Sequence, residues 1–129
     1  MKLLTIAVLL IGSTVTAAAQ TAVYPDLPSV QTELMPLAKE QGWAVEVATV
    51  CDRLSMDDGL IVLMHLQNRA ARRFDKPYSE RVSAAWGAGD ALAKANLADD
   101  RAGTCRKAVS VRPKVETWRK AAIRWRDGE

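Results

Sequence analysis

Along most of the chain the hydrophobic positions recur every three or four residues, which is typical of amphipathic α-helices. A first helix is expected over residues 30–41, capped by Ser29 and ended by Gly42. Pro36 lies inside this pattern and either kinks the helix or starts a second short one. Residues 43–54 fit a helix or a Val-rich strand, and we favour a helix because no second convincing strand exists to pair with it.

The next segment is the most apolar one of the expected domain. Ser55, followed by Asp57 and Asp58, has the features of a helix start, namely a capping hydroxyl and acidic side chains in the first turn. Residues 60–66 are apolar nearly all round, which predicts a helix in the middle of a bundle. The segment ends in three cations: Arg69, Arg72 and Arg73.

Further helices are expected towards the C-terminus. Pro77 fits the first turn of one helix, and Pro113 fits the first turn of the last. Between them, Asp99 or Asp100 can cap another helix. One face of the last helix is apolar and consists of Val115, Trp118, Ala122 and Trp125. The pattern therefore predicts an all-α fold, a small single-domain bundle of about five helices.

Residues 1–19 have the pattern of a secretion signal. One lysine precedes the apolar run 3–12, which is about half the length that a membrane-spanning helix needs. Small residues follow, so cleavage is expected near Ala19, which leaves residues 20–129 as one helical domain. We therefore expect a periplasmic or secreted protein without a stable membrane anchor.

Cysteine usage and charge narrow the picture. Cys51 and Cys105 are the two cysteines of the chain, and such a pair in an oxidising compartment predicts a disulfide. Closing so long a loop contributes about 4 kcal/mol in the chain-entropy model. The formal net charge of +3, of which cleavage removes one, is only mildly basic. It gives no reason to expect a nucleic-acid partner.

No catalytic, metal or cofactor motif stands out. His65 is the only histidine, and no motif supplies it with a nucleophile or a carboxylate, so we interpret it as structural. The paired aspartates lack the spacing of an EF-hand and are interpreted as helix caps. Gly87 and Gly89 lack the third glycine of a dinucleotide fingerprint, and they indicate instead a close approach of a helix or a partner. We expect no enzymatic activity, no metal and no cofactor.

The most distinctive surface feature is a basic C-terminal helix with two tryptophans. Such a helix can bind an acidic protein, an anionic membrane or nucleic acid, or it can be an ordinary solvated face. Trp and Arg are enriched where interfaces gain most of their binding energy. We predict partner binding by Trp118, Arg119, Arg124, Trp125 and Arg126. If this face is not used, the alternative is the cluster of Arg69, Arg72 and Arg73.

A resemblance to the C-terminal third of the periplasmic acid-stress chaperones is carried by three stretches. They are Thr104-Cys105-Arg106-Lys107, Pro113 and Trp118-Arg119-Lys120-Ala121. The region around Cys51 does not match that family. The layout of signal peptide, helical domain and one long-range disulfide is also similar to that of periplasmic immunity proteins that neutralise cell-wall amidases.

These features lead to a ranked functional expectation. The first is an exported, non-enzymatic protein that binds another exported protein with an acidic surface, as an inhibitor, immunity protein or assembly factor. The alternative is a periplasmic acid-stress-type chaperone, and the third class is a small-ligand-binding protein or an enzyme. The sequence leaves the oligomeric state open.

Overall fold

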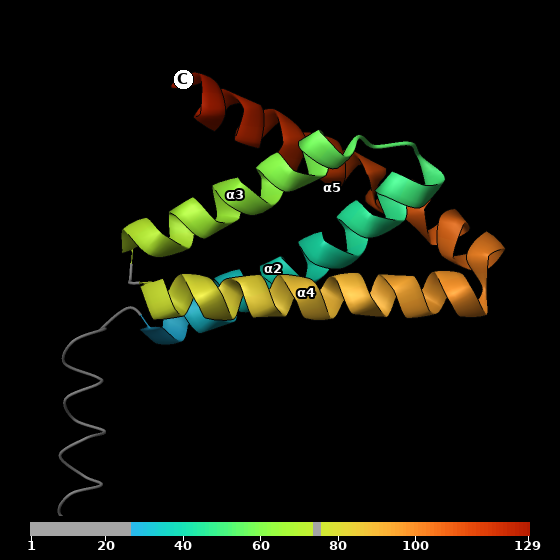
Figure 1. Ribbon diagram of the computed structural model, residues 1–129, viewed down its shortest axis with the longest axis horizontal. Coiled ribbons are helices and arrows are strands. Elements are labelled where there is room, and N and C mark those ends of the chain that lie inside the picture. Colours follow the sequence, from blue (N-terminus) through green and yellow to red (C-terminus); the bar gives the residue numbers. More distant parts are fainter. Residues whose placement is uncertain (1–26, 74–75) are drawn as a thin grey trace, which may run out of the picture. The chain divides into compact units, whose positions relative to one another are not determined.

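The computed structural model describes residues 27–73 and 76–129 as four α-helices (Figure 1). They are α2 (Leu27–Cys51), α3 (Met56–Arg73), α4 (Lys76–Asp99) and α5 (Arg101–Asp127). The described residues contain no strand, so the all-α prediction is confirmed, although these helices number four and not about five. Residues 33–129 form one compact unit. The predicted signal peptide and its cleavage near Ala19 lie outside the described residues.

Two predicted helix breaks are wrong, which explains the lower count. Helix α2 begins at Leu27, before the predicted cap at Ser29, and it runs through Gly42 to Cys51. The helix predicted over residues 43–54 is therefore the second half of α2, and it is not a strand. Helix α5 likewise runs through Pro113.

Gly42 is needed for close packing against α4, not for ending a helix. A Cβ atom at Gly42 would overlap the backbone carbonyl group of Trp86. In the same way, a Cβ at Gly89 would overlap the carbonyl group of Lys39 in α2. We call these two reciprocal contacts the glycine seam. The expected close approach at Gly89 is thus confirmed, whereas Gly87 is exposed and would meet nothing within 4 Å.

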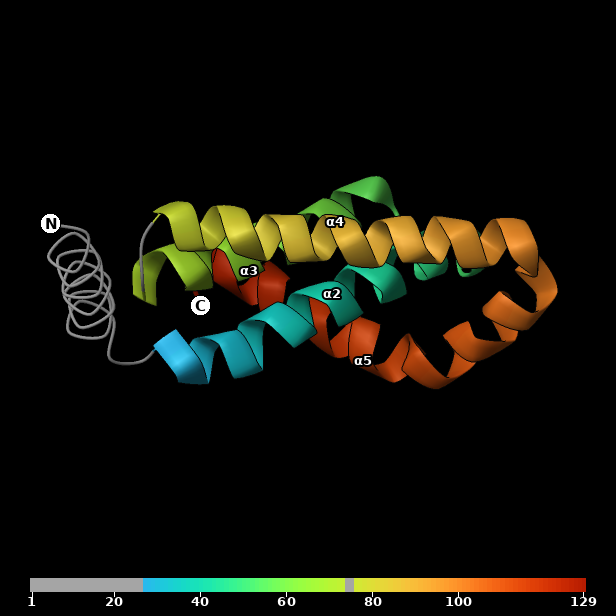
Figure 2. The ribbon, with the colours of Figure 1, turned by 90° about the horizontal axis from the view of Figure 1, so that it is seen from below.

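Helix α5 runs back from the end of α4 to α3, as Figures 1 and 2 show. Two ion pairs lie on either side of Pro113: Arg112 with Asp52, directly after α2, at 2.5 Å and Lys114 with Glu40 of α2 at 2.7 Å. Proline removes one backbone donor from a helix interior. These pairs and the packing of Val111 and Val115 against α2 hold α5 on both sides of Pro113.

The predicted disulfide is confirmed and joins α2 to α5. Cys51 and Cys105 have Cα atoms 5.5 Å apart. One buried cluster beside it contains Val47, Ala93 and Ala108, from three different helices. A second cluster on the α2–α5 contact contains Ala44, Ala48 and Val115, against which Trp43, Leu54, Val111 and Trp118 pack.

The helix starts follow the local chemistry that the sequence predicts. The backbone N–H of Asp58 donates to the Ser55 hydroxyl at 3.1 Å, at the start of α3. At the start of α5, the N–H of Gly103 donates to the Asp100 carboxylate at 2.9 Å. These caps satisfy backbone donors that have no partner inside the helix. Gly128 ends α5 in the left-handed conformation, with φ of 80°.

Candidate partner-binding face

One side of α3 carries large apolar side chains that no other described helix covers. Met56, Leu60 and Met64 are 82%, 54% and 46% exposed. Residues four positions apart lie on the same side of a helix, so the three form a row along α3. Val62 and Leu66, each 2% exposed, lie on the covered side. The prediction that residues 60–66 are surrounded on all sides is therefore wrong.

An apolar hollow separates this row from α5. It has a volume of about 520 Å³, and its walls include Leu60, Ile61 and Met64 of α3 and Trp125 of α5. Asp57 and Arg126 lie at its polar edges. We call this space the apolar hollow. Its walls offer an incoming side chain apolar contact area from two helices.

A second hollow of about 540 Å³ shares Trp125 with the first, and we call it the basic hollow. Arg72 of α3 and Arg124 of α5 both line it, together with His65, Ala121, Gly128 and Glu129. Among the described residues, no carboxylate forms an ion pair with Arg72 or Arg124. Two cations from different helices therefore face one space without a partner from the described part of the chain.

The His65 ring stacks on Trp125 where the two hollows adjoin. The ring centroids are 5.4 Å apart and the planes are inclined by 24°. Burial lowers the pKa of His65 below its ordinary value of 6.5, and the positive charge of Arg69 lowers it further. The imidazole is therefore neutral at pH 7. The stacked Trp125 ring lies between an apolar and a cationic space.

A third hollow, of about 420 Å³, adjoins the apolar hollow at Leu60. It is lined by Met56 and Leu60 of α3 and, across from them, by Glu46 of α2, Trp86 and Lys94. Burial raises the pKa of Glu46, and the nearby Asp90 carboxylate raises it further. Lys94 in turn donates a hydrogen bond to Asp90 at 2.8 Å. On this side the cation, Lys94, is already paired within the chain.

Of the five predicted partner-binding residues, Trp118 packs on the core, and Arg124, Trp125 and Arg126 line the two hollows between α3 and α5. Trp118 packs against the buried cluster of Ala44, Ala48 and Val115, so its ring belongs largely to the core. Trp125 and Arg124 line the basic hollow, and Trp125 and Arg126 line the apolar hollow. Arg126 also pairs with its neighbour Asp127 at 3.0 Å.

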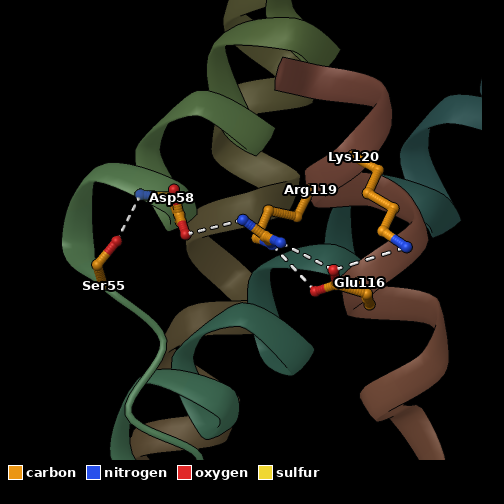
Figure 3. Close-up of polar contacts among 5 residues, drawn as sticks. All are labelled: Ser55, Asp58, Glu116, Arg119 and Lys120. Carbon is orange, nitrogen blue, oxygen red and sulfur yellow. Dashed lines mark hydrogen bonds and ion pairs between the residues drawn. The ribbon is translucent and has the colours of Figure 1, made fainter. Parts of the chain in front are cut away.

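Arg119 is held by carboxylates of its own chain, as Figure 3 shows. Two of its nitrogens donate to Glu116, at 3.0 and 2.8 Å, and a third donates to Asp58 of α3 at 3.4 Å. Its side chain is only 28% exposed. The bonds between Arg119 and Glu116 raise the pKa of the former and lower that of the latter. Arg119 thus ties α5 to α3.

The fold brings together two basic clusters that the sequence pattern presents as alternatives. Arg72 belongs to the cluster that the sequence offers as the alternative to the C-terminal helix, yet it shares the basic hollow with Arg124. The sequence pattern predicts residues 60–66 in the middle of a bundle, whereas Leu60 and Met64 are about half exposed. The i, i+4 spacing of Met56, Leu60 and Met64 is the one sequence signal of a common exposed side.

Comparisons with known proteins supply no relative: no family model, curated protein or solved structure matches the chain. In the described part of the chain, no three His, Cys, Asp or Glu side chains are grouped so that they could hold a metal ion. None of the described helices is both long and apolar enough to cross a membrane.

Proposed function

We propose that this is an exported protein that acts without catalysis by binding another exported protein, as an inhibitor, immunity protein or assembly factor. We define the α3–α5 face as Leu60, Met64, His65, Arg72, Arg124 and Trp125, and assign partner binding to it. The observation that carries the proposal is the exposure of Leu60 and Met64 beside Trp125 and two cations without a described partner.

The composition of this face matches what binding requires. Covering apolar surface contributes about 25 cal/mol per Å² removed from water, so Leu60 and Met64 gain free energy only if something covers them. Contiguous exposed apolar surface beside polar groups is typical of interaction sites. Methionine adapts to irregular partners, and tryptophan with arginine dominates interface energies. Leu92 and Val109 are equally exposed, but neither lines any of these hollows.

Export is part of the proposal and has its own support. The disulfide between Cys51 and Cys105 is typical of proteins that mature in an oxidising compartment. The predicted signal peptide supplies the route. Intact mass of protein recovered from the periplasm should match a chain that starts near Gln20 and has no free thiol. A mass that includes Met1 would contradict export with processing.

The binding test compares two double variants of the mature protein immobilised on beads. Leu60→Asp with Met64→Asp places charges on the α3–α5 face, and Leu92→Asp with Val109→Asp is the control on exposed apolar residues elsewhere. Each is exposed to periplasmic extract, and the captured proteins are identified by mass spectrometry. We expect one protein to be retained by the wild type and the control pair and lost from the face pair.

Two results would contradict the proposal. In one, the face pair retains the same proteins as the wild type. In the other, both pairs lose them equally, which indicates general stickiness of exposed apolar side chains. Circular dichroism of both variants checks that the helices persist, because all four positions are exposed and their substitution should leave the fold intact.

A second candidate, the acid-stress-type chaperone, is favoured by one feature of α5. This helix is held to α2 and α3 by ion pairs whose negative partners are Asp52, Glu40 and Asp58. Loosening of these attachments would uncover the apolar side of α5 that packs against α2. Reversible loss of tertiary structure in acid, together with suppression of client aggregation there, would favour this candidate over the first.

A further inference from the structure

The apolar hollow and the basic hollow meet at one ring, Trp125. The first offers Leu60, Ile61 and Met64 as walls, and the second offers two guanidinium groups. A ligand that fills both must carry an apolar group and an anionic group close together. The requirement for both groups restricts the possible ligands more than a basic surface alone would.

We propose that the partner docks through one segment that places a large apolar side chain in the apolar hollow and a carboxylate in the basic hollow. This inference rests on the proposed function and names the chemistry that the α3–α5 face recognises. Trp125, oriented by its stack with His65 at 5.4 Å, separates the two contacts and fixes their spacing.

Arg72 and Arg124 make a carboxylate the complement of the basic hollow. A guanidinium group presents its donors in a planar fork that matches the two oxygens of a carboxylate. Arg119, on the same helix as Arg124, shows the pattern within this chain, because two of its nitrogens donate to the two oxygens of Glu116. Among described residues, Arg72 and Arg124 have no such partner, so a carboxylate from outside would supply it.

The charges around the face favour a protein segment over a phosphate-rich surface. Asp57 lies at the edge of the apolar hollow, and Glu129 lies at the basic hollow. Asp127 pairs with Arg126, which removes a further free cation. A membrane or a nucleic acid presents many phosphates at once, and these would meet the carboxylates as well as the arginines. One carboxylate beside one apolar side chain avoids that repulsion.

The test uses two kinds of cross-link in periplasmic extract, with the mature wild-type chain as the background. In one variant, p-benzoylphenylalanine replaces Met64 and reports what enters the apolar hollow on illumination. In others, Arg72→Lys or Arg124→Lys introduces an amine that a carbodiimide joins to a carboxylate in direct contact. Arg101→Lys, at an exposed position on α5 away from both hollows, is the matched control.

We expect position 64 to cross-link to a protein, and the new amine at position 72 or 124 to join an Asp or Glu on the same peptide of that protein. The Arg101→Lys variant should give no such link. Arg72→Gln with Arg124→Gln should weaken affinity for the identified protein by about tenfold or more, since hydrogen bonds between two charged groups are stronger than neutral ones. Neither arginine is used by the described fold, so the variant should remain folded.

Failure of this inference differs from failure of the proposed function. If position 64 captures a protein but positions 72 and 124 join only Glu129 of the same chain, or nothing, the carboxylate contact is wrong and protein binding stands. If position 64 captures nothing and the Leu60 and Met64 variants change no interaction, the proposed function is wrong. Binding to phosphatidylglycerol vesicles that the double Gln variant abolishes, without any protein cross-link, would overturn the inference as well.

Discussion

The α2–α4 contact and the α3–α5 face differ in how completely the chain itself covers them. Across the glycine seam, Gly42 and Gly89 let the two backbones approach so closely that no side chain fits between them. On the α3–α5 face, by contrast, Leu60 and Met64 lie about half exposed next to cations without a described partner. The α2–α4 contact is fully packed within the chain. The side chains of the α3–α5 face would be covered only by another molecule.

This difference separates stability from function in a testable way. Substitutions in the α2–α4 contact should change the free energy of unfolding. They should reduce partner binding only as far as they unfold the chain. Substitutions on the open face should change binding and leave the free energy of unfolding almost unaltered. Matched pairs of variants test that division.

The largest effect is expected from removing the disulfide. Cys51→Ser with Cys105→Ser frees a loop of 54 residues, and the chain-entropy model gives a loss of about 4 kcal/mol in unfolding free energy. Urea unfolding of the oxidised wild type and the double variant measures the difference. The wild type with added reductant is the control and should unfold like the variant. An unchanged midpoint would mean that the α2–α5 packing holds without the bond.

Two leucines on one helix give the next comparison. Leu66→Ala empties a site that is 2% exposed and should cost about 2–5 kcal/mol. Leu60→Ala, at a position 54% exposed, should change stability by no more than about 0.5 kcal/mol. Thermal or urea unfolding of both variants tests this. Comparable losses from the two would show that the exposed row of α3 is covered in solution, for instance by a second copy of the chain.

A smaller and opposite pair of effects is expected from two glycines of α4. Gly89→Ala places a methyl group against the Lys39 carbonyl, and forced overpacking typically costs about 1–3 kcal/mol. Gly87→Ala meets nothing within 4 Å and should stabilise the helix by roughly 0.5–1 kcal/mol. The two variants differ only in position, so equal effects of the same sign would contradict the glycine seam.

The sequence predicts those parts of the fold that depend on local chemistry. The caps at Ser55 and Asp100 need only a side-chain oxygen next to the free backbone donors of a helix start, and both are present as expected. The breaks predicted at Gly42 and Pro113 are wrong because tertiary contacts decide them. Gly42 is used for the approach of α4, and the pairs of Arg112 and Lys114 hold the helix on both sides of Pro113.

The candidate site could be predicted only in part for the same reason. Residue type alone predicts that Arg124 and Trp125 bind a partner, since arginine and tryptophan are enriched at interfaces. That Arg72 joins them depends on where α3 crosses α5, which no local pattern encodes. An apolar helix also gives little indication of which side remains uncovered, so the pattern alone predicts Leu60 and Met64 in the core, where the structure has them about half exposed.

The smallest effect concerns His65, whose ionisation reports on the open face. Burial and the charge of Arg69 hold its pKa below 6.5 in the folded chain, so the unfolded chain takes up the proton more readily. The contribution of His65 to stability is therefore present above pH 6.5. It declines as the pH falls from there towards the folded-state pKa. NMR titration of the imidazole should give a value below 6.5.

Three variants and the addition of a bound partner test the causes of the lowered pKa of His65. Arg69→Gln should raise the pKa of His65 without restoring its ordinary value, because burial, the larger cause, remains. Arg101→Gln, far along the chain at the start of α5, should leave it unchanged. Trp125→Ala removes the stacked ring and should raise the pKa by admitting water. A carboxylate bound between Arg72 and Arg124 would add a negative charge beside the imidazole, so a docked partner should also raise the pKa. A value at or above 6.5 in the free protein would mean that the imidazole ring is not covered as the structure has it.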